Sequence, residues 1–154
     1  MALLATVRPG SWNWALFLHV GGAMALVASL VVALYTIRIA RERGDQPAAQ
    51  FAFRTLLRFS LPAYIVMRVG AQIIADKEKL SDSNATWIGI GYMTSDVGAL
   101  LLLIGIVLTG LMARRARSGR SVASAGQLRA AGVISGILVA AYIVAIWAMT
   151  TKPG

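Results

Sequence analysis

Four long apolar stretches, separated by short polar segments, dominate the hydrophobic pattern of this chain. They run over about residues 14–35, 51–75, 87–112 and 128–150. A helix of about 20 apolar residues is long enough to cross the hydrocarbon of a bilayer. The pattern therefore predicts an all-α fold, a four-helix transmembrane bundle. Pro62 lies inside the second stretch and predicts a kink there, because proline removes one backbone hydrogen bond.

Composition places the chain among membrane proteins. Of its 154 residues, 58% are hydrophobic and only 14% are charged, which is too little charge to cover the surface of a soluble domain. The length fits a single domain, residues 1–154. The first apolar stretch is too long for a signal peptide and has no small-residue cleavage site after Tyr35, so we expect it to be retained. Without cysteine, no disulfide or thiolate metal site is possible.

The basic residues predict the orientation of the chain. The formal net charge is +9, and ten of the fifteen Lys and Arg residues lie in or beside the first loop, 38–47, and the third loop, 114–127. Basic loops stay in the cytoplasm, so both ends and the second loop are expected outside. The same rule explains the charge without a nucleic-acid partner. The excess of arginine over lysine indicates a GC-rich bacterium and its cytoplasmic (inner) membrane.

The four tryptophans fit this orientation. Trp12, Trp14, Trp87 and Trp147 all fall at the outer ends of the predicted spans. Tryptophan is enriched where the bilayer meets water, so an outer aromatic belt explains them.

Three ionisable side chains lie well inside the spans: His19, Arg68 and Asp96. Counting from the outer ends at about 1.5 Å per residue places them at depths of roughly 8, 10 and 13 Å. Tyr142 falls at a similar level. Charged groups at this depth are costly and are functional candidates, so the sequence predicts one polar layer in the outer half of the bundle.

Helical spacing groups the polar residues further. Tyr64, Arg68, Gln72 and Asp76 recur every four residues and share one helix face. Tyr92 and Asp96 are also four residues apart, in the third span. The expected pocket residues are His19, Tyr64, Arg68, Gln72, Tyr92, Asp96 and Tyr142. We expect Arg68 to pair with Asp96, because an unpaired arginine in lipid would be far less favourable. The pair can serve as an internal ion pair that fixes helix register. It can equally belong to a pocket for a small anion, a head group, a quinone-like ring or a proton.

His19 is the single histidine and leaves three interpretations open. It can line the pocket as a hydrogen-bonded side chain, carry a proton near neutral pH, or serve as an axial ligand of haem b with a Met or a second subunit's His opposite. No HxxxH or HxH pattern accompanies it, so a mononuclear zinc or copper site within one chain is not expected.

Small residues recur at a spacing of four in several spans. One set is Gly132, Gly136 and Ala140, another is Gly21, Ala25 and Ser29, and a third is Gly91, Ser95, Gly98 and Gly105. Small residues let helix backbones approach closely. Packing within the bundle is the favoured interpretation, and a homodimer or larger membrane complex through Gly132, Gly136 and Ala140 is the alternative.

Several segments carry a resemblance. They are Leu16-Phe17-Leu18-His19-Val20-Gly21-Gly22-Ala23, Leu61-Pro62-Ala63-Tyr64 through Met67-Arg68-Val69-Gly70, Ser95-Asp96-Val97-Gly98 and Trp147-Ala148-Met149-Thr150-Thr151-Lys152-Pro153. Across nearly the whole chain they resemble a group of uncharacterised four-span proteins of GC-rich bacteria, described as predicted integral membrane proteins. The His-Val-Gly-Gly segment also resembles the first helix of copper-resistance D-type membrane proteins. Neither resemblance implies a known activity.

The sequence thus favours a non-enzymatic membrane binding or accessory protein, with a polar pocket around the Arg68–Asp96 pair and His19. A haem-binding redox subunit that uses His19 and a proton-coupled small transporter are the alternatives. No nucleophile–base pair and no metal motif points to an enzyme.

Overall fold

A computed structural model describes residues 13–78, 86–118 and 125–151. Trp12 and four of the fifteen Lys and Arg residues (Arg8, Lys79, Arg120 and Lys152) lie outside these ranges. Within them the chain is all-helical and has no strand. The helices in chain order are α1 (Asn13–Arg43), α2 (Gln46–Thr55), the π-helical turn η2 (Leu56–Ser60), α3 (Leu61–Glu78), α4 (Thr86–Arg117) and α5 (Ala125–Thr151).

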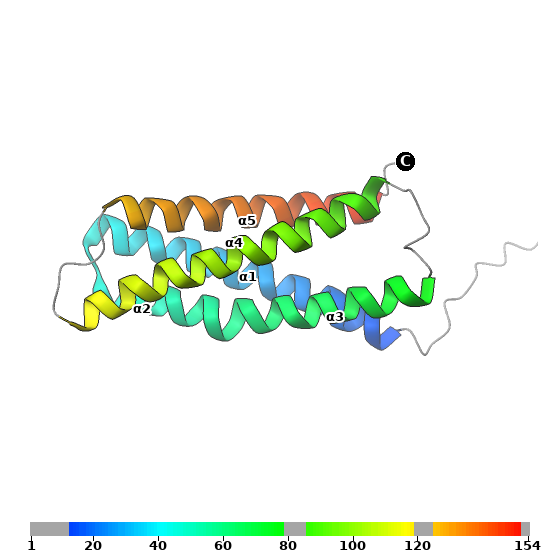
Figure 1. Ribbon diagram of the computed structural model, residues 1–154, viewed down its shortest axis with the longest axis horizontal. Coiled ribbons are helices and arrows are strands. Elements are labelled where there is room, and N and C mark those ends of the chain that lie inside the picture. Colours follow the sequence, from blue (N-terminus) through cyan, green and yellow to red (C-terminus); the bar gives the residue numbers. More distant parts are fainter. Residues whose placement is uncertain (1–12, 79–85, 119–124, 152–154) are drawn as a thin grey trace, which may run out of the picture.

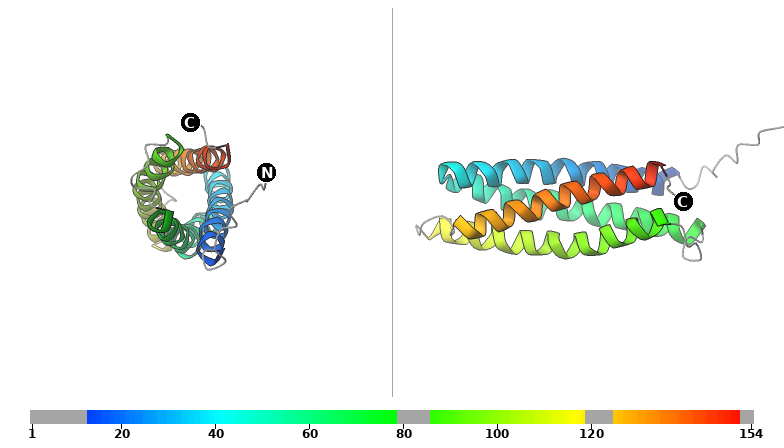
Figure 2. Two further views of the ribbon diagram at one scale, coloured as in Figure 1. Left: turned by 90° about the vertical axis from the view of Figure 1, so that its right-hand side faces the viewer. Right: turned by 90° about the horizontal axis from the view of Figure 1, so that it is seen from above.

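These helices form a bundle whose members run up and down its long axis (Figure 1). α2, η2 and α3 follow one another as a single helical path beside α1, and Figure 2 shows the four paths around a common centre. One end carries Trp14, Trp87 and Trp147, and we call it the tryptophan end. The other carries the α1–α2 turn and the arginines that end α4, and we call it the basic end.

The connection between α1 and α2 is only two residues long, shorter than the predicted loop 38–47. α1 continues to Arg43 and ends at Gly44, whose φ of 63° is the left-handed conformation that glycine adopts most readily. Asp45 then caps α2, because its side chain accepts a hydrogen bond from Ala48 N at 3.2 Å. Pro47 lies in the first turn, where its missing N–H removes no helical bond.

Arg38, Arg41, Glu42 and Arg43 are therefore part of α1 rather than of a loop. Arg38 and Glu42 pair along α1 at 2.7 Å, and the hydrogen bond from Arg38 lowers the pKa of Glu42. The predicted third loop, 114–127, is also too long, since α4 reaches Arg117 and α5 begins at Ala125. Hydrophobicity marks where a helix can leave the hydrocarbon, but polar residues with good helix propensity carry the helix further.

Pro62 is accommodated by the π turn that precedes it. Leu61 N–H donates to the carbonyl oxygen of Leu56, five residues earlier. The wider turn relieves the crowding that a proline ring causes one turn back in an α-helix. The same turn places Ser60 against α1, where Ser60 Oγ lies 2.8 Å from Ser29 Oγ in a fully buried contact.

α1 and α3 approach each other so closely that two glycines are required. A Cβ on Gly22 would lie 2.6 Å from Met67 N, and one on Gly70 would lie 2.6 Å from His19 N. Both neighbours are backbone atoms, which cannot turn aside. This contact fixes the position of His19 and Met67 relative to one another.

The other small residues divide into two groups. In α4, Gly91 and Gly98 face α5, where a Cβ would meet Met149 Cε at 2.7 Å and Tyr142 Oη at 2.6 Å. A Cβ on Gly21 or Gly136 would meet nothing within 4 Å, and Ala25 and Ala140 are exposed. Packing within the bundle is thus the correct interpretation for these α4 glycines and for the buried Ser29. A Cβ on Gly132 would lie 3.7 Å from Ile37 Cγ2, whereas no such contact explains Gly21 or Gly136.

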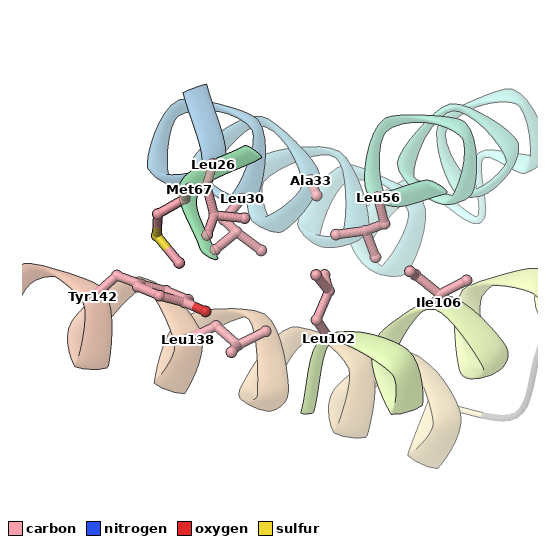
Figure 3. Close-up of a cluster of buried hydrophobic side chains, with 9 residues drawn as sticks. All are labelled: Leu26, Leu30, Ala33, Leu56, Met67, Leu102, Ile106, Leu138 and Tyr142. Carbon is pink, nitrogen blue, oxygen red and sulfur yellow. The ribbon is translucent and has the colours of Figure 1, made fainter. Parts of the chain in front are cut away.

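The centre of the bundle is an apolar cluster to which all helical paths contribute (Figure 3). Its members are Leu26, Leu30, Ala33, Leu56, Met67, Leu102, Ile106, Leu138 and Tyr142. A second cluster, which includes Ile37, Ala52, Met112 and Leu128, fills the basic end. Met67 and Tyr142 form the edge of the central cluster that faces the tryptophan end.

Three of the helices are long and apolar enough to cross a membrane. They cover Asn13–Arg43, Thr86–Arg115 and Gly126–Thr151, each with a mean hydropathy of 2.2 in its most apolar part. The path through α2, η2 and α3 is interrupted by the π turn and carries Arg54, Arg58 and Arg68. By length and composition, three helices of this all-helical bundle are thus able to cross a membrane.

Candidate functional site

A cavity of about 450 Å³ lies among all four helical paths in the half of the bundle near the tryptophan end. Most of its lining is apolar. The lining residues with polar groups are His19 from α1, Arg68 from α3, Trp87, Tyr92, Thr94 and Ser95 from α4, and Tyr142 and Thr150 from α5. A mostly apolar cavity with a few polar groups is the usual form of a small-molecule site.

The order of the lining residues along each helix gives the cavity a floor and a mouth. Along the helices, the lining residues farthest from the tryptophan end are Met24, Met67, Ser95 and Tyr142, one from each path. Met67, Ser95 and Tyr142 are buried there, whereas the Met24 side chain is exposed. Two of these, Met67 and Tyr142, belong to the central apolar cluster, and Figure 3 shows the Met67 side chain extending toward the Tyr142 ring. The lining continues to the helix ends at the tryptophan end, so the cavity rests directly on the packed core.

His19 is held in one orientation by the backbone of α3. Its Nδ1 lies 3.1 Å from the carbonyl oxygen of Met67. A carbonyl can only accept, so Nδ1 carries the proton in this contact. A ring with a single proton then has a bare Nε2, which can accept a hydrogen bond or bind a metal. His19 is half-buried and lines the cavity.

Arg68 joins α3 to α4. Its Nη2 donates to Asp96 Oδ1 at 3.2 Å, and its guanidinium carbon lies 5.3 Å from the centre of the Tyr92 ring. The pair is not buried, since the Arg68 and Asp96 side chains are 31% and 65% exposed. Arg68 lines the cavity and Asp96 does not. The Asp96 carboxylate therefore binds the Arg68 guanidinium from the side that faces away from the cavity.

Tyr64 makes a second polar connection between the same helices. Its hydroxyl donates to the carbonyl oxygen of Ser95 at 3.3 Å. α3 and α4 have few close backbone approaches, whereas α3 packs closely along α1. The wall of the cavity between α3 and α4 is therefore held largely by polar side chains from Tyr64, Arg68 and Tyr92.

Tyr142 lies at the floor with its hydroxyl unsatisfied. The residue is only 5% exposed. Tyr142 Oη is the one buried side-chain polar atom in the described ranges that has no hydrogen-bond partner. Gly98 leaves the space for this hydroxyl, since a Cβ there would lie 2.6 Å from it. A buried hydroxyl without a partner costs about 1–3 kcal/mol, so it calls for an explanation.

The structure separates the seven predicted pocket residues. His19, Arg68, Tyr92 and Tyr142 line the cavity. Tyr64 and Asp96 stand behind its α3–α4 wall. Gln72 is exposed and donates to Asp76 Oδ1 at 2.9 Å, one turn along its own helix.

Sequence reasoning missed the methionines. Met24, Met67 and Met149 line the cavity from three different helices, and the Met67 carbonyl orients His19. No periodic pattern distinguishes a methionine that lines a cavity from one that fills a core. The role of a backbone carbonyl has no signal in the sequence.

Comparison of this chain with protein-family models, curated proteins and solved structures found no match. Its geometry alone therefore shows what the site can do. It offers a hydrogen-bond acceptor at His19 and a neutralised cation at Arg68, around an otherwise apolar volume.

Proposed function

We propose that this protein is a non-enzymatic binding or accessory protein of the bacterial inner membrane that holds a small molecule in its cavity. The single observation that carries the proposal is the 450 Å³ cavity itself, which His19 and Arg68 line among mostly apolar side chains. A bound molecule would fill a volume that close packing otherwise removes from protein interiors.

The proposal includes a fourth crossing, by the path through α2, η2 and α3. This path lies beside α1 over the length of the bundle, so a bilayer that surrounds α1 would surround it as well. Arg54 and Arg58 lie toward the basic end and can reach the head groups with their long side chains. Arg68 is paired with Asp96. The charges on this path thus have partners or a route to water.

The proposal also includes an orientation in the membrane, which follows from other arginines. The basic end carries Arg38, Arg41, Arg43, Arg114 and Arg115 on helices that the structure describes. Positive charge beside a span favours the cytoplasm, so the basic end faces inward. The cavity then lies in the outer half of the membrane and reaches toward the outer surface.

A matched pair of variants tests the proposal. Ala71→Phe puts a large ring where the small Ala71 side chain lines the cavity, whereas Ala28→Phe puts the same ring on an exposed face of α1. The purified proteins are extracted with organic solvent, and the released small molecules are identified by mass spectrometry. We expect a compound that wild type and Ala28→Phe retain and Ala71→Phe loses. The same set of compounds from all three proteins would reject the proposal.

A haem-binding subunit is the second candidate, and the orientation of His19 favours it. A histidine that donates Nδ1–H to a backbone carbonyl and presents Nε2 to a cavity is arranged as metal-ligating histidines usually are. Haem bound there would give the purified protein a Soret band that His19→Leu abolishes. Purified protein with no Soret band after haem supplementation would rule this candidate out.

A further inference from the structure

The chemistry of the cavity lining narrows the class of molecule that fits. We infer that the cavity binds a neutral, lipid-soluble aromatic ring with a hydroxyl group, a phenol or a quinol, whose O–H donates to His19 Nε2. This inference rests on the proposed function, because it names the ligand of the same cavity. Each element of the assignment comes from a different part of the lining.

The hydroxyl is assigned from His19. The Met67 carbonyl takes the Nδ1 proton, so Nε2 is an acceptor when the ring carries one proton. An acceptor in a mostly apolar cavity favours a ligand group that donates, such as a hydroxyl. A molecule that carries only carbonyl oxygens would leave Nε2 without a partner.

The neutral charge is assigned from Arg68. It is the only cationic side chain among the lining residues that the structure describes, and its guanidinium is already engaged by Asp96 and by the Tyr92 ring. An anion in the cavity would have to compete with the Asp96 carboxylate. The remaining surface is apolar, where an unpaired anion is strongly disfavoured.

The ring is assigned from the sulfur and aromatic side chains. Met24, Met67 and Met149 reach the cavity from α1, α3 and α5, and Trp87 and Tyr92 reach it from α4. Thioether sulfur makes favourable contacts with aromatic rings, and aromatic side chains pair with one another. The flexible methionines also let the cavity adapt to a flat molecule.

Tyr142 closes the floor with its ring. Its hydroxyl is buried against Gly98, which does not line the cavity, so it offers a ligand no hydrogen bond. The polar contact of the ligand is therefore assigned to His19 alone.

Three probes with one ring separate the classes. They are 1-naphthol, naphthalene and 1-naphthyl phosphate, which carry a hydroxyl, no polar group and an anion. Binding to the purified full chain in nanodiscs of zwitterionic lipid is measured by equilibrium dialysis, with empty nanodiscs to correct for partition into lipid. We expect saturable binding of 1-naphthol about tenfold tighter than that of naphthalene, which corresponds to one hydrogen bond, and no saturable binding of the phosphate.

Variants locate the contact. His19→Leu should reduce the affinity for 1-naphthol to that for naphthalene and leave naphthalene unchanged. Gln72→Leu, which replaces an exposed polar residue outside the lining, should change neither. If His19→Leu does not fold, 1-methoxynaphthalene provides the second readout on the wild-type protein. Its ether oxygen cannot donate a hydrogen bond, so it should bind about as weakly as naphthalene, and binding as tight as that of 1-naphthol would overturn the assignment.

The outcomes distinguish the inference from the proposed function. Equal binding of 1-naphthol and naphthalene, tightest binding of the phosphate, or no saturable binding of any probe each overturns the assignment of a phenol or quinol. The proposed function still holds after any of these results if wild type retains a compound that Ala71→Phe loses. If no such compound is found, the proposed function is rejected as well.

Discussion

His19 Nδ1 lies 3.1 Å from the carbonyl oxygen of Met67, on a helix that is 48 residues away in the chain. The two residues meet because Gly22 and Gly70 bring the backbones of α1 and α3 into contact on either side of them. The ring therefore has its orientation set by the backbone, and its second nitrogen is left for the cavity. Arg68, the next residue after Met67, connects the same level of α3 to Asp96 of α4.

The first prediction concerns the tautomer of His19. Because the Met67 carbonyl can only accept, we expect the singly protonated ring to carry its proton on Nδ1 and not on Nε2. The chain has one histidine, so protein labelled with ¹⁵N-histidine gives a spectrum that needs no assignment. A protonated Nε2 with a bare Nδ1 at neutral pH would contradict the geometry.

The second prediction concerns the α1–α3 contact. Gly22→Ala would place a Cβ 2.6 Å from Met67 N and should force the helices apart. We expect a loss of about 1–3 kcal/mol in the free energy of unfolding, typical of an overpacked site. Unfolding of the purified protein in mixed micelles, followed by circular dichroism, measures the change.

The neighbouring glycine is the control for that experiment. A Cβ on Gly21 meets nothing within 4 Å, and alanine favours a helix over glycine by up to about 1 kcal/mol. Gly21→Ala should therefore leave stability unchanged or raise it. Equal destabilisation by both variants would mean that the effect does not arise from contact with α3.

The contrast between these two glycines shows where sequence reasoning reached its limit. A spacing of four selected Gly21, Ala25 and Ser29, of which only Ser29 is buried in the bundle, whereas a Cβ on Gly21 meets nothing within 4 Å and Ala25 is exposed. Gly22 does not fit this spacing at all, because the residues four before and four after it are Leu18 and Leu26. The packed face, Gly22, Leu26 and Ser29, is decided by which residues of α3 approach, and that is not encoded in the first helix alone.

The candidate site shows the same division. Hydrophobicity and spacing were enough to predict helices and to select His19, Arg68, Tyr92 and Tyr142, all of which line one cavity. Gln72 shares a spacing with Arg68 but bonds to Asp76 on its own helix. Spacing identifies residues on one helix face. The neighbouring helices decide which of those residues reach the cavity.

The third prediction concerns the unsatisfied hydroxyl of Tyr142. Tyr142→Phe removes a buried polar atom that has no partner and keeps the ring in the central cluster. Without ligand, we expect the free energy of unfolding to stay the same or to rise by about 1 kcal/mol, because the desolvation cost is removed. Thermal unfolding of ligand-free protein measures it. A clear loss of stability would reveal a partner for the hydroxyl.

The fourth prediction concerns the Arg68–Asp96 pair. Arg68→Met alone leaves the Asp96 carboxylate without its cation, so it should destabilise more than Arg68→Met combined with Asp96→Asn. The two side chains are partly exposed, so we expect a coupling energy of up to about 1 kcal/mol in a double-mutant cycle. If the double variant also keeps the compound that wild type retains, the pair fixes the helices. Loss of that compound at restored stability would assign the pair to the binding site.

The fifth prediction concerns the path of the chain through the membrane. Because the chain has no cysteine, single cysteines at Glu42, Thr86, Ser118 and Thr151 report one helix end each. In spheroplasts, a maleimide that cannot cross the membrane should label the cysteines at Thr86 and Thr151, and should label those at Glu42 and Ser118 only after permeabilisation. This alternation requires the path through α2, η2 and α3 to cross the bilayer. Equal accessibility at Glu42 and Thr86 would show that only α1, α4 and α5 cross.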